Sequence, residues 1–224
     1  MCIFYQKKDA DTCFDFSVLN AYNYFMFIVI EGIDGAGCET QAKNLYQMCK
    51  DKSRLVPTLI KYPDYEKNIG KLINEFLYQN KDLTAEQQFL LYTMQFIFDK
   101  KWLTEKRKQG LVISDRYFTT TLCYQTLEGI KLDVALKFAT DFKIEKPDVV
   151  FYLDVDPNIA IQRKSGEAKE KNRREKDFEF IHRTHQQYDQ LVKNQVWTKW
   201  VRIDGNKTID EITKDIYNRI INYK

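Results

Sequence analysis

The sequence predicts an α/β protein of three layers, in which a five-stranded parallel sheet carries helices on both faces. Short apolar runs alternate along the chain with helix-length amphipathic stretches, and each run has the composition of a strand buried on both sides. The expected strands are residues 26–31, 58–62, 111–114, 149–153 and 200–203. Strands and helices that alternate in this way favour a parallel sheet, because each parallel pair needs a crossover connection.

Helix starts are marked between the expected strands. The capping-box pattern, Ser or Thr followed three residues later by Glu or Gln, occurs at 84–87 and 208–211. Asp156 followed by Pro157 is typical of an N-cap and a proline at the first helical position. These signals place helices in the gaps that the strand pattern leaves.

Composition excludes several classes of protein. The 224 residues are 44% hydrophobic and 30% charged, so the chain can bury a core. The longest apolar runs, 26–30 and 149–153, are far shorter than the ~18 residues that cross a bilayer, so no membrane partner is expected. A net charge of +3 predicts no nucleic-acid partner. Five cysteines without metal-ligand spacing indicate a reducing, cytoplasmic location.

The chain divides into an extension and one domain. Residues 1–25 have neither the apolar stretch of a signal peptide nor the pattern of the remainder, so we interpret them as an N-terminal extension of unknown role. Residues 26–224 read as a single domain.

A glycine-rich loop follows the first expected strand. Gly32, Gly35 and Gly37 stand between that strand and a helix, where backbone N–H groups can surround a phosphate. The P-loop motif then requires a lysine, but the chain has Cys38 followed by Glu39. A thiolate at this place would repel phosphate, and Glu39 would add further negative charge. The loop therefore predicts phosphate binding without its usual cation.

Two further motifs accompany this loop. They are 115–117 with Thr120, Tyr124 and Gln125, and 147–157 with Arg163. Together with residues 27–37 and 40–41, they closely resemble thymidylate kinase, and the order and spacing agree over roughly 26–215. The resemblance implies a P-loop kinase fold and a Mg²⁺-dependent transfer of phosphate from ATP to dTMP. It also implies a homodimer.

The resemblance assigns roles to individual residues. It implies an ATP site made by Gly32, Gly35, Ala36, Gly37, Cys38, Glu39 and Thr40. It implies a dTMP site made by Asp34, Tyr62, Tyr65, Tyr92, Phe96, Arg116, Thr120, Thr121 and Tyr124. Catalytic roles fall on Asp115, Arg116, Arg173 and Arg174, and Thr40 and Asp115 would hold Mg²⁺. Residues 164–176 correspond to the lid over ATP, whose arginines would serve because Gly35 occupies the loop position where other members have arginine.

Two alternatives remain open at the level of sequence. Cys38 in place of the lysine is compatible with a nucleotide-binding homologue that has little or no activity. Phe96 occupies the position of an arginine that commonly contacts thymine, and Asp64 replaces another arginine, so a different deoxynucleoside monophosphate is a second possible acceptor.

Overall fold

The computed structural model describes residues 25–52, 56–79, 82–166 and 170–223, so the expected extension lies outside it apart from Phe25. Its five strands form one parallel sheet in the order β2-β3-β1-β4-β5. The strands are β1 (Phe27–Glu31), β2 (Thr58–Lys61), β3 (Val112–Asp115), β4 (Val149–Asp154) and β5 (Trp200–Asp204). The predicted fold class is confirmed, and each predicted strand is found within one residue of its expected ends.

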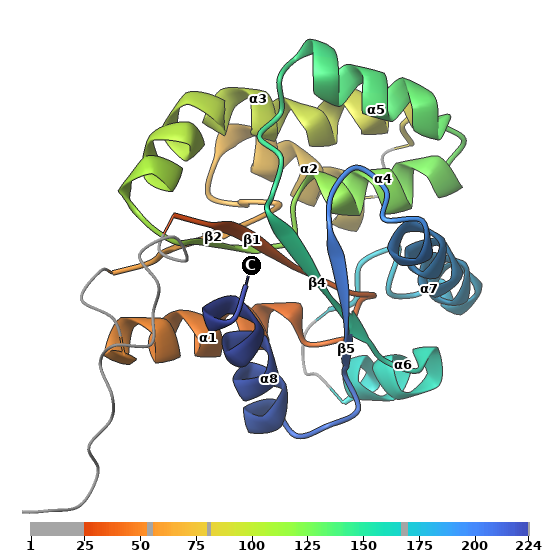
Figure 1. Cartoon of the computed structure of the whole chain (residues 1–224). Coiled ribbons are helices and arrows are strands. Elements are labelled where there is room, and N and C mark those ends of the chain that lie inside the picture. The colour runs from red at the N-terminus through yellow and green to blue at the C-terminus, as the bar shows by residue number, and fades with distance from the viewer. Residues whose placement is uncertain (1–24, 53–55, 80–81, 167–169, 224) are drawn as a thin grey trace, which may run out of the picture.

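Helices cover both faces of the sheet (Figure 1). In the described residues they are α1 (Cys38–Lys52), α2 (Asn68–Tyr78), α3 (Ala85–Gln109), α4 (Phe118–Leu127), α5 (Leu132–Asp141), α6 (Pro157–Ser165), α7 (Phe178–Lys193) and α8 (Ile209–Ile221). Helices α1 and α8 lie together on one face, and α3, α4 and α5 lie on the other (Figure 1). No helix of the described residues is both long enough and apolar enough to cross a membrane.

The predicted helix starts are confirmed at three helices. Thr84 caps α3 and Thr208 caps α8, each within a complete capping box. The Asp156 side chain accepts a 2.8 Å hydrogen bond from the backbone N–H of Asn158 at the start of α6. Because caps satisfy backbone N–H groups that a helix leaves free, they fix where these helices begin.

An aromatic cluster lies between the sheet and α3. The Phe96 ring packs at 4.9 Å from the rings of both Tyr62 and Tyr117, and Phe118 contacts it edge-on. A smaller apolar core joins α2 to the start of α3. These two clusters hold α2 and α3 beside the end of the sheet where the glycine-rich loop begins.

The carboxyl ends of β1, β2 and β3 bring three segments together. The loop follows β1, Asp115 ends β3, and Lys61 ends β2. In the sheet register Asp115 pairs with Ile30 on one side and with Lys61 on the other. Ligands of open parallel sheets bind at this edge, so the register places the candidate site here.

Candidate active site

The glycine-rich loop needs its glycines for steric reasons. Gly35 and Gly37 have φ angles of +90° and +94°, which side-chain-bearing residues rarely adopt. A Cβ atom on Gly35 would also lie 2.4 Å from the carbonyl oxygen of Ala160 in α6. A Cβ on Gly32 would lie 2.7 Å from the Cβ of Ala36. The loop therefore cannot carry a side chain at position 35 unless α6 moves.

Cys38 is the first residue of α1 and is buried. Burial raises the pKa of its thiol well above the usual range. The thiol is therefore neutral, so the repulsion of phosphate that a thiolate would cause does not arise. Position 38 gives the loop no negative charge, but it gives no positive charge either.

Glu39 does not stand as an isolated negative charge. Its two carboxylate oxygens accept hydrogen bonds from Lys43 at 2.7 Å and from Lys61 at 2.6 Å. Hydrogen bonds from Lys43 first and Lys61 second lower the pKa of Glu39 to about 2. The unpaired charge that the sequence predicts beside the loop is therefore compensated, through an ion pair between residues 22 positions apart.

Asp115 is nearly buried at the end of β3. Burial raises its pKa to about 6, although Arg116 and Lys61 act in the opposite direction. The Lys61 ammonium lies 3.8 Å from the Asp115 carboxylate. Thr40 is exposed in the first turn of α1. A buried carboxylate and an exposed hydroxyl on adjoining elements are oxygen donors of the kind that Mg²⁺ prefers.

Arg116 connects β3 to the loop. Its backbone has a φ of 64°, a conformation that few non-glycine residues adopt and that recurs at active sites. Its Nη2 donates a 2.7 Å hydrogen bond to the Asp34 carboxylate, and its Nη1 lies 4.0 Å from the carboxylate of Glu31. The guanidinium also lies over the Tyr124 ring, at 5.8 Å from its centre.

Glu31 lies beneath the site and contacts two of its residues, Thr120 and Arg116, but the sequence reasoning read it only as the end of a strand. Its side chain is fully buried and accepts hydrogen bonds from the hydroxyls of Thr119, Thr120 and Tyr188. Burial raises the pKa of Glu31, and these hydroxyls partly oppose the shift. The carboxylate therefore fixes the start of α4 and the position of Thr120 in the site.

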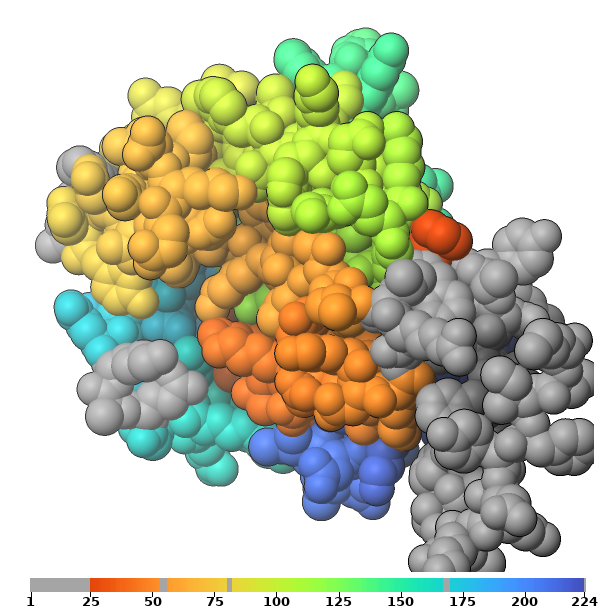
Figure 2. All heavy atoms as spheres, turned by 90° about the vertical axis from the view of Figure 1, so that its left-hand side faces the viewer, coloured from red at the N-terminus to blue at the C-terminus, as the bar shows by residue number. Residues whose placement is uncertain are grey.

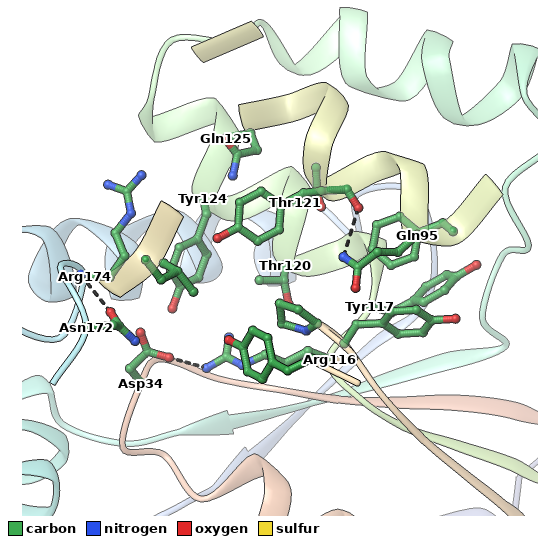
Figure 3. Close-up of a pocket in the computed structure, with 16 residues that line it drawn as sticks. Asp34, Gln95, Arg116, Tyr117, Thr120, Thr121, Tyr124, Gln125, Asn172 and Arg174 are labelled. Atoms are coloured by element: carbon green, nitrogen blue, oxygen red, sulfur yellow. Dashed lines mark hydrogen bonds and ion pairs between the residues drawn. The ribbon is translucent and has the colours of Figure 1, made fainter. Parts of the chain in front are cut away.

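All nine residues predicted for the acceptor line one pocket beside the loop (Figure 3). They are Asp34, Tyr62, Tyr65, Tyr92, Phe96, Arg116, Thr120, Thr121 and Tyr124. Arg116 and Asp34 lie together at one end of the pocket. Thr121 and Gln125, both on α4, lie away from this pair (Figure 3). Residues from the loop, α3 and α4 thus converge on one cavity, as a small-molecule site requires.

Several lining residues had no predicted role. They are Pro63, Leu77, Gln95, Tyr117, Gln125 and Asn172. Gln125 is the most informative of these, because its side-chain carbonyl is buried and has no hydrogen-bond partner among the described residues. Buried polar atoms are nearly always paired, so an unpaired one that lines a pocket indicates a ligand group. The signal in the sequence was its place in the Tyr124–Gln125 motif.

The two arginines of the predicted lid contact different parts of the protein. Arg174 lines the pocket, pairs with Glu128 and donates a 2.9 Å hydrogen bond to Gln88. Arg173 instead contacts Asp82 at 3.2 Å and lies over the Phe76 ring of α2. Residues 167–169 of the lid lie outside the described residues. Helix α2 and the α6 region lie on the same side of the molecule (gold and cyan in Figure 2).

Comparison with known proteins agrees with this geometry. The family model of thymidylate kinase matches residues 30–216. The probable thymidylate kinase of Methanococcus maripaludis is 34% identical over 201 residues, which cover 87% of this chain and 94% of that protein. The probable thymidylate kinase of Methanosphaera stadtmanae is 29% identical, covering 88% and 98% of the two chains, and the thymidylate kinase of Danio rerio is 29% identical, covering 84% and 86%. The chain therefore belongs to the thymidylate kinase family and is an ATP-dependent kinase.

Proposed function

We propose that the chain transfers the γ-phosphoryl group of ATP to dTMP and releases dTDP and ADP. The observation that carries this proposal is the pocket beside the loop, where the Arg116–Asp34 pair lies among aromatic and hydroxyl side chains. A nucleoside monophosphate offers the matching groups, namely a phosphate, a sugar hydroxyl and a flat base. The names of the relatives support thymidine as the nucleoside.

We assign the acceptor phosphate to Arg116. Its guanidinium is a planar donor that suits a phosphate, and its side chain already lies within the pocket. When the phosphate takes this cation, the Asp34 carboxylate is released from its ion pair. We assign Asp34 to the 3′-hydroxyl of the acceptor sugar, which can donate to it. Tyr62 and Tyr65 line the same pocket, and we assign them to the acceptor as well.

The base would lie against the aromatic side chains of α3. Tyr92 and Phe96 line the pocket from that helix, and aromatic faces bind a flat base by stacking or edge contact. The unpaired carbonyl of Gln125 can accept a hydrogen bond from the N3–H of thymine. Thr121 adds a hydroxyl beside it. This arrangement supports a pyrimidine acceptor even though Phe96 replaces the usual arginine.

Tyr124 would select the sugar. Its ring lies between Arg116 and α7, where it packs against Phe180 and Tyr188. A ring held in this way leaves little room for an additional hydroxyl, so we assign Tyr124 to the exclusion of ribonucleotides at the 2′ position.

The ATP phosphates would bind the backbone of the loop and the first turn of α1. This site comprises Gly32, Gly35, Ala36, Gly37, Cys38, Glu39 and Thr40. Mg²⁺ fits the oxygen donors of Asp115 and Thr40, and the raised pKa of Asp115 marks a buried carboxylate that a cation would stabilise. When bound, the ion would neutralise charge on the transferring phosphate.

Transfer would then require alignment and charge neutralisation by side chains of the chain itself. Arg116 would hold the acceptor, and the lid would bring a further cation, since position 35 cannot carry one. Arg174 is the better placed of the two lid arginines, because it lines the pocket while Arg173 contacts Asp82. Closure of the lid would also exclude water and so prevent hydrolysis of ATP.

We also propose that the protein is a homodimer of the cytoplasm. Helix α3 exposes an apolar stripe at helical spacing, made of Leu90, Met94, Ile97, Phe98 and Trp102. An exposed apolar face of this kind is typical of a protein interface. The three cysteines of the described residues are free and buried, which supports a reducing compartment.

The acceptor is tested by ADP formation from Mg-ATP with dTMP, dUMP, dCMP and dGMP at equal concentrations. We expect dTMP to give the highest kcat/KM and dTDP to appear in equal amount with ADP. Faster turnover of dCMP or dGMP would show that dTMP is not the preferred acceptor. ADP formation without any acceptor would indicate hydrolysis instead of transfer.

A further inference from the structure

Lys61 occupies an unusual place at the end of β2. Its ammonium lies 2.6 Å from the Glu39 carboxylate and 3.8 Å from that of Asp115. Glu39 is the second residue of the helix that follows the glycine-rich loop, and Asp115 pairs with Lys61 in the sheet register. One cation is therefore held between the first turn of α1 and the carboxylate that we assign to Mg²⁺.

This is the region where the loop lacks a charge. In P-loop enzymes a lysine from the loop holds the β- and γ-phosphates, close to the metal and its aspartate. Here the residue at that position is Cys38, a small buried thiol. Lys61 reaches the same region from the neighbouring strand, so the cation and the loop come from different segments of the chain.

Lys61 can leave Glu39 without isolating that carboxylate. Lys61 bonds one oxygen of Glu39, whereas Lys43 bonds the other at 2.7 Å. The Lys61 side chain is 44% exposed and carries its ammonium group on a flexible stem of four methylene groups, so it can turn toward an arriving phosphate. Glu39 then keeps Lys43 as its partner.

We propose that Lys61 binds the β/γ-phosphate end of ATP and supplies the positive charge that Cys38 removes from the loop. This inference rests on the proposed function, because it concerns the ATP site of the same reaction. It explains how a kinase can work with this loop, and it makes Glu39 the group that Lys61 leaves when ATP binds.

The test compares Lys61→Met with Lys43→Met, since both lysines pair with Glu39 and only one lies near Asp115. We expect Lys61→Met to lower kcat with dTMP by about 10²–10³ and to weaken ATP binding, measured by calorimetry without dTMP, while KM for dTMP stays the same. Lys43→Met loses one exposed ion pair and should change ATP affinity by less than about fivefold. Lys61→Arg should recover part of the loss.

Rescue from position 38 gives the sharpest readout. Cys38→Lys introduced into the Lys61→Met protein should restore ATP affinity, because the two lysines would serve the same phosphates, and the two changes should not be additive. Glu39→Gln frees Lys61 and removes a negative charge, so it should strengthen ATP binding. A purely structural Glu39–Lys61 bridge predicts the opposite, a loss as large as that of Lys61→Met.

Equal ATP affinities for Lys61→Met and Lys43→Met would overturn the proposal, as would a loss of affinity in Glu39→Gln. Thermal unfolding of each variant checks the fold, and Lys61→Gln replaces Lys61→Met if the latter does not fold. The affinity measurement also separates this inference from the proposed function. Wild-type protein that binds ATP through Lys61 but does not phosphorylate dTMP would contradict only the latter.

Discussion

The Arg116 guanidinium donates a 2.7 Å hydrogen bond to the Asp34 carboxylate, and this contact joins the end of β3 to the glycine-rich loop. Both side chains are mostly buried, so water screens the pair less than it screens a surface ion pair. The contact links the two residues that we assign to the acceptor phosphate and the acceptor hydroxyl. Binding of dTMP would thus exchange an internal ion pair for two contacts with the ligand.

Replacement of Arg116 tests the acceptor side of this exchange. Arg116→Lys keeps the charge but loses the planar donor pair, so kcat/KM for dTMP should fall by about 10² while ATP affinity is unchanged. Initial rates at varied dTMP measure the effect. The matched control is Arg183→Lys, on the exposed surface of α7, which should behave as wild type. Equal kcat/KM values for the two variants would remove Arg116 from the acceptor site.

Gln125→Leu should affect stability and binding in opposite directions. Leucine removes a buried carbonyl that has no partner among the described residues, so the free energy of unfolding without ligand should stay equal or rise. Affinity for dTMP should fall by about tenfold or more, because a hydrogen bond to the base is lost. Denaturant unfolding and calorimetry measure the two quantities. Unchanged dTMP affinity would show that this carbonyl has another role.

Tyr124 is tested by the ratio of deoxyribo to ribo acceptors. Tyr124→Ala opens space beside the sugar, so kcat/KM for ribothymidine monophosphate should rise relative to that for dTMP by about tenfold. Tyr124→Phe keeps the ring and should leave the ratio at its wild-type value. Because a ratio is compared within each variant, loss of stability cancels. An unchanged ratio in the alanine variant would assign sugar selection elsewhere.

The proposed role of Asp115 predicts that Mg²⁺ binding depends on pH. Burial raises its pKa to about 6, so the fraction ionised falls as the pH decreases through 6, and a protonated carboxyl group cannot ligate the ion. The affinity of the nucleotide-free protein for Mg²⁺ should therefore be about tenfold lower at pH 5 than at pH 7. Titration at several pH values measures this, and Asp115→Asn should abolish the dependence. A constant affinity across this range would place the metal elsewhere.

The apolar stripe of α3 provides the test of the dimer. Phe98 lies within this stripe and is 71% exposed, so Phe98→Glu should place a charge in the interface. Light scattering should then give the mass of a monomer. Phe178→Glu is the control, because Phe178 is also exposed, at 51%, but begins α7. The control should keep the wild-type mass. A monomeric wild type, or a dimer that survives Phe98→Glu, would contradict the assignment.

Much of the fold could be predicted because its signals are local in the sequence. A strand buried on both faces has to be continuously apolar, and 149–153 shows this directly. Capping boxes lie within four residues, so the start of α3 could also be identified. The acceptor residues were assigned through the resemblance, and the structure brings all nine to one pocket.

What the sequence did not reveal depends on contacts between distant segments. Lys61 and Glu39 form an ion pair although they are 22 positions apart in the sequence. Glu31 accepts a hydrogen bond from the hydroxyl of Tyr188, which is 157 positions away. No spacing rule connects such residues, because their proximity arises only when the strands pair. The neutral state of Cys38 likewise depends on burial by its neighbours, and the different partners of Arg173 and Arg174 depend on where α2 packs.

The most direct test of the account is ADP formation from Mg-ATP and dTMP by the wild-type protein and Cys38→Lys, measured side by side. We predict that both turn over at comparable rates, since in our proposal Lys61 already supplies the wild-type chain with a cation for the phosphates. A wild type that binds nucleotides without turnover, beside an active Cys38→Lys variant, would contradict the account. The chain would then be a member of the family that is inactivated at one residue.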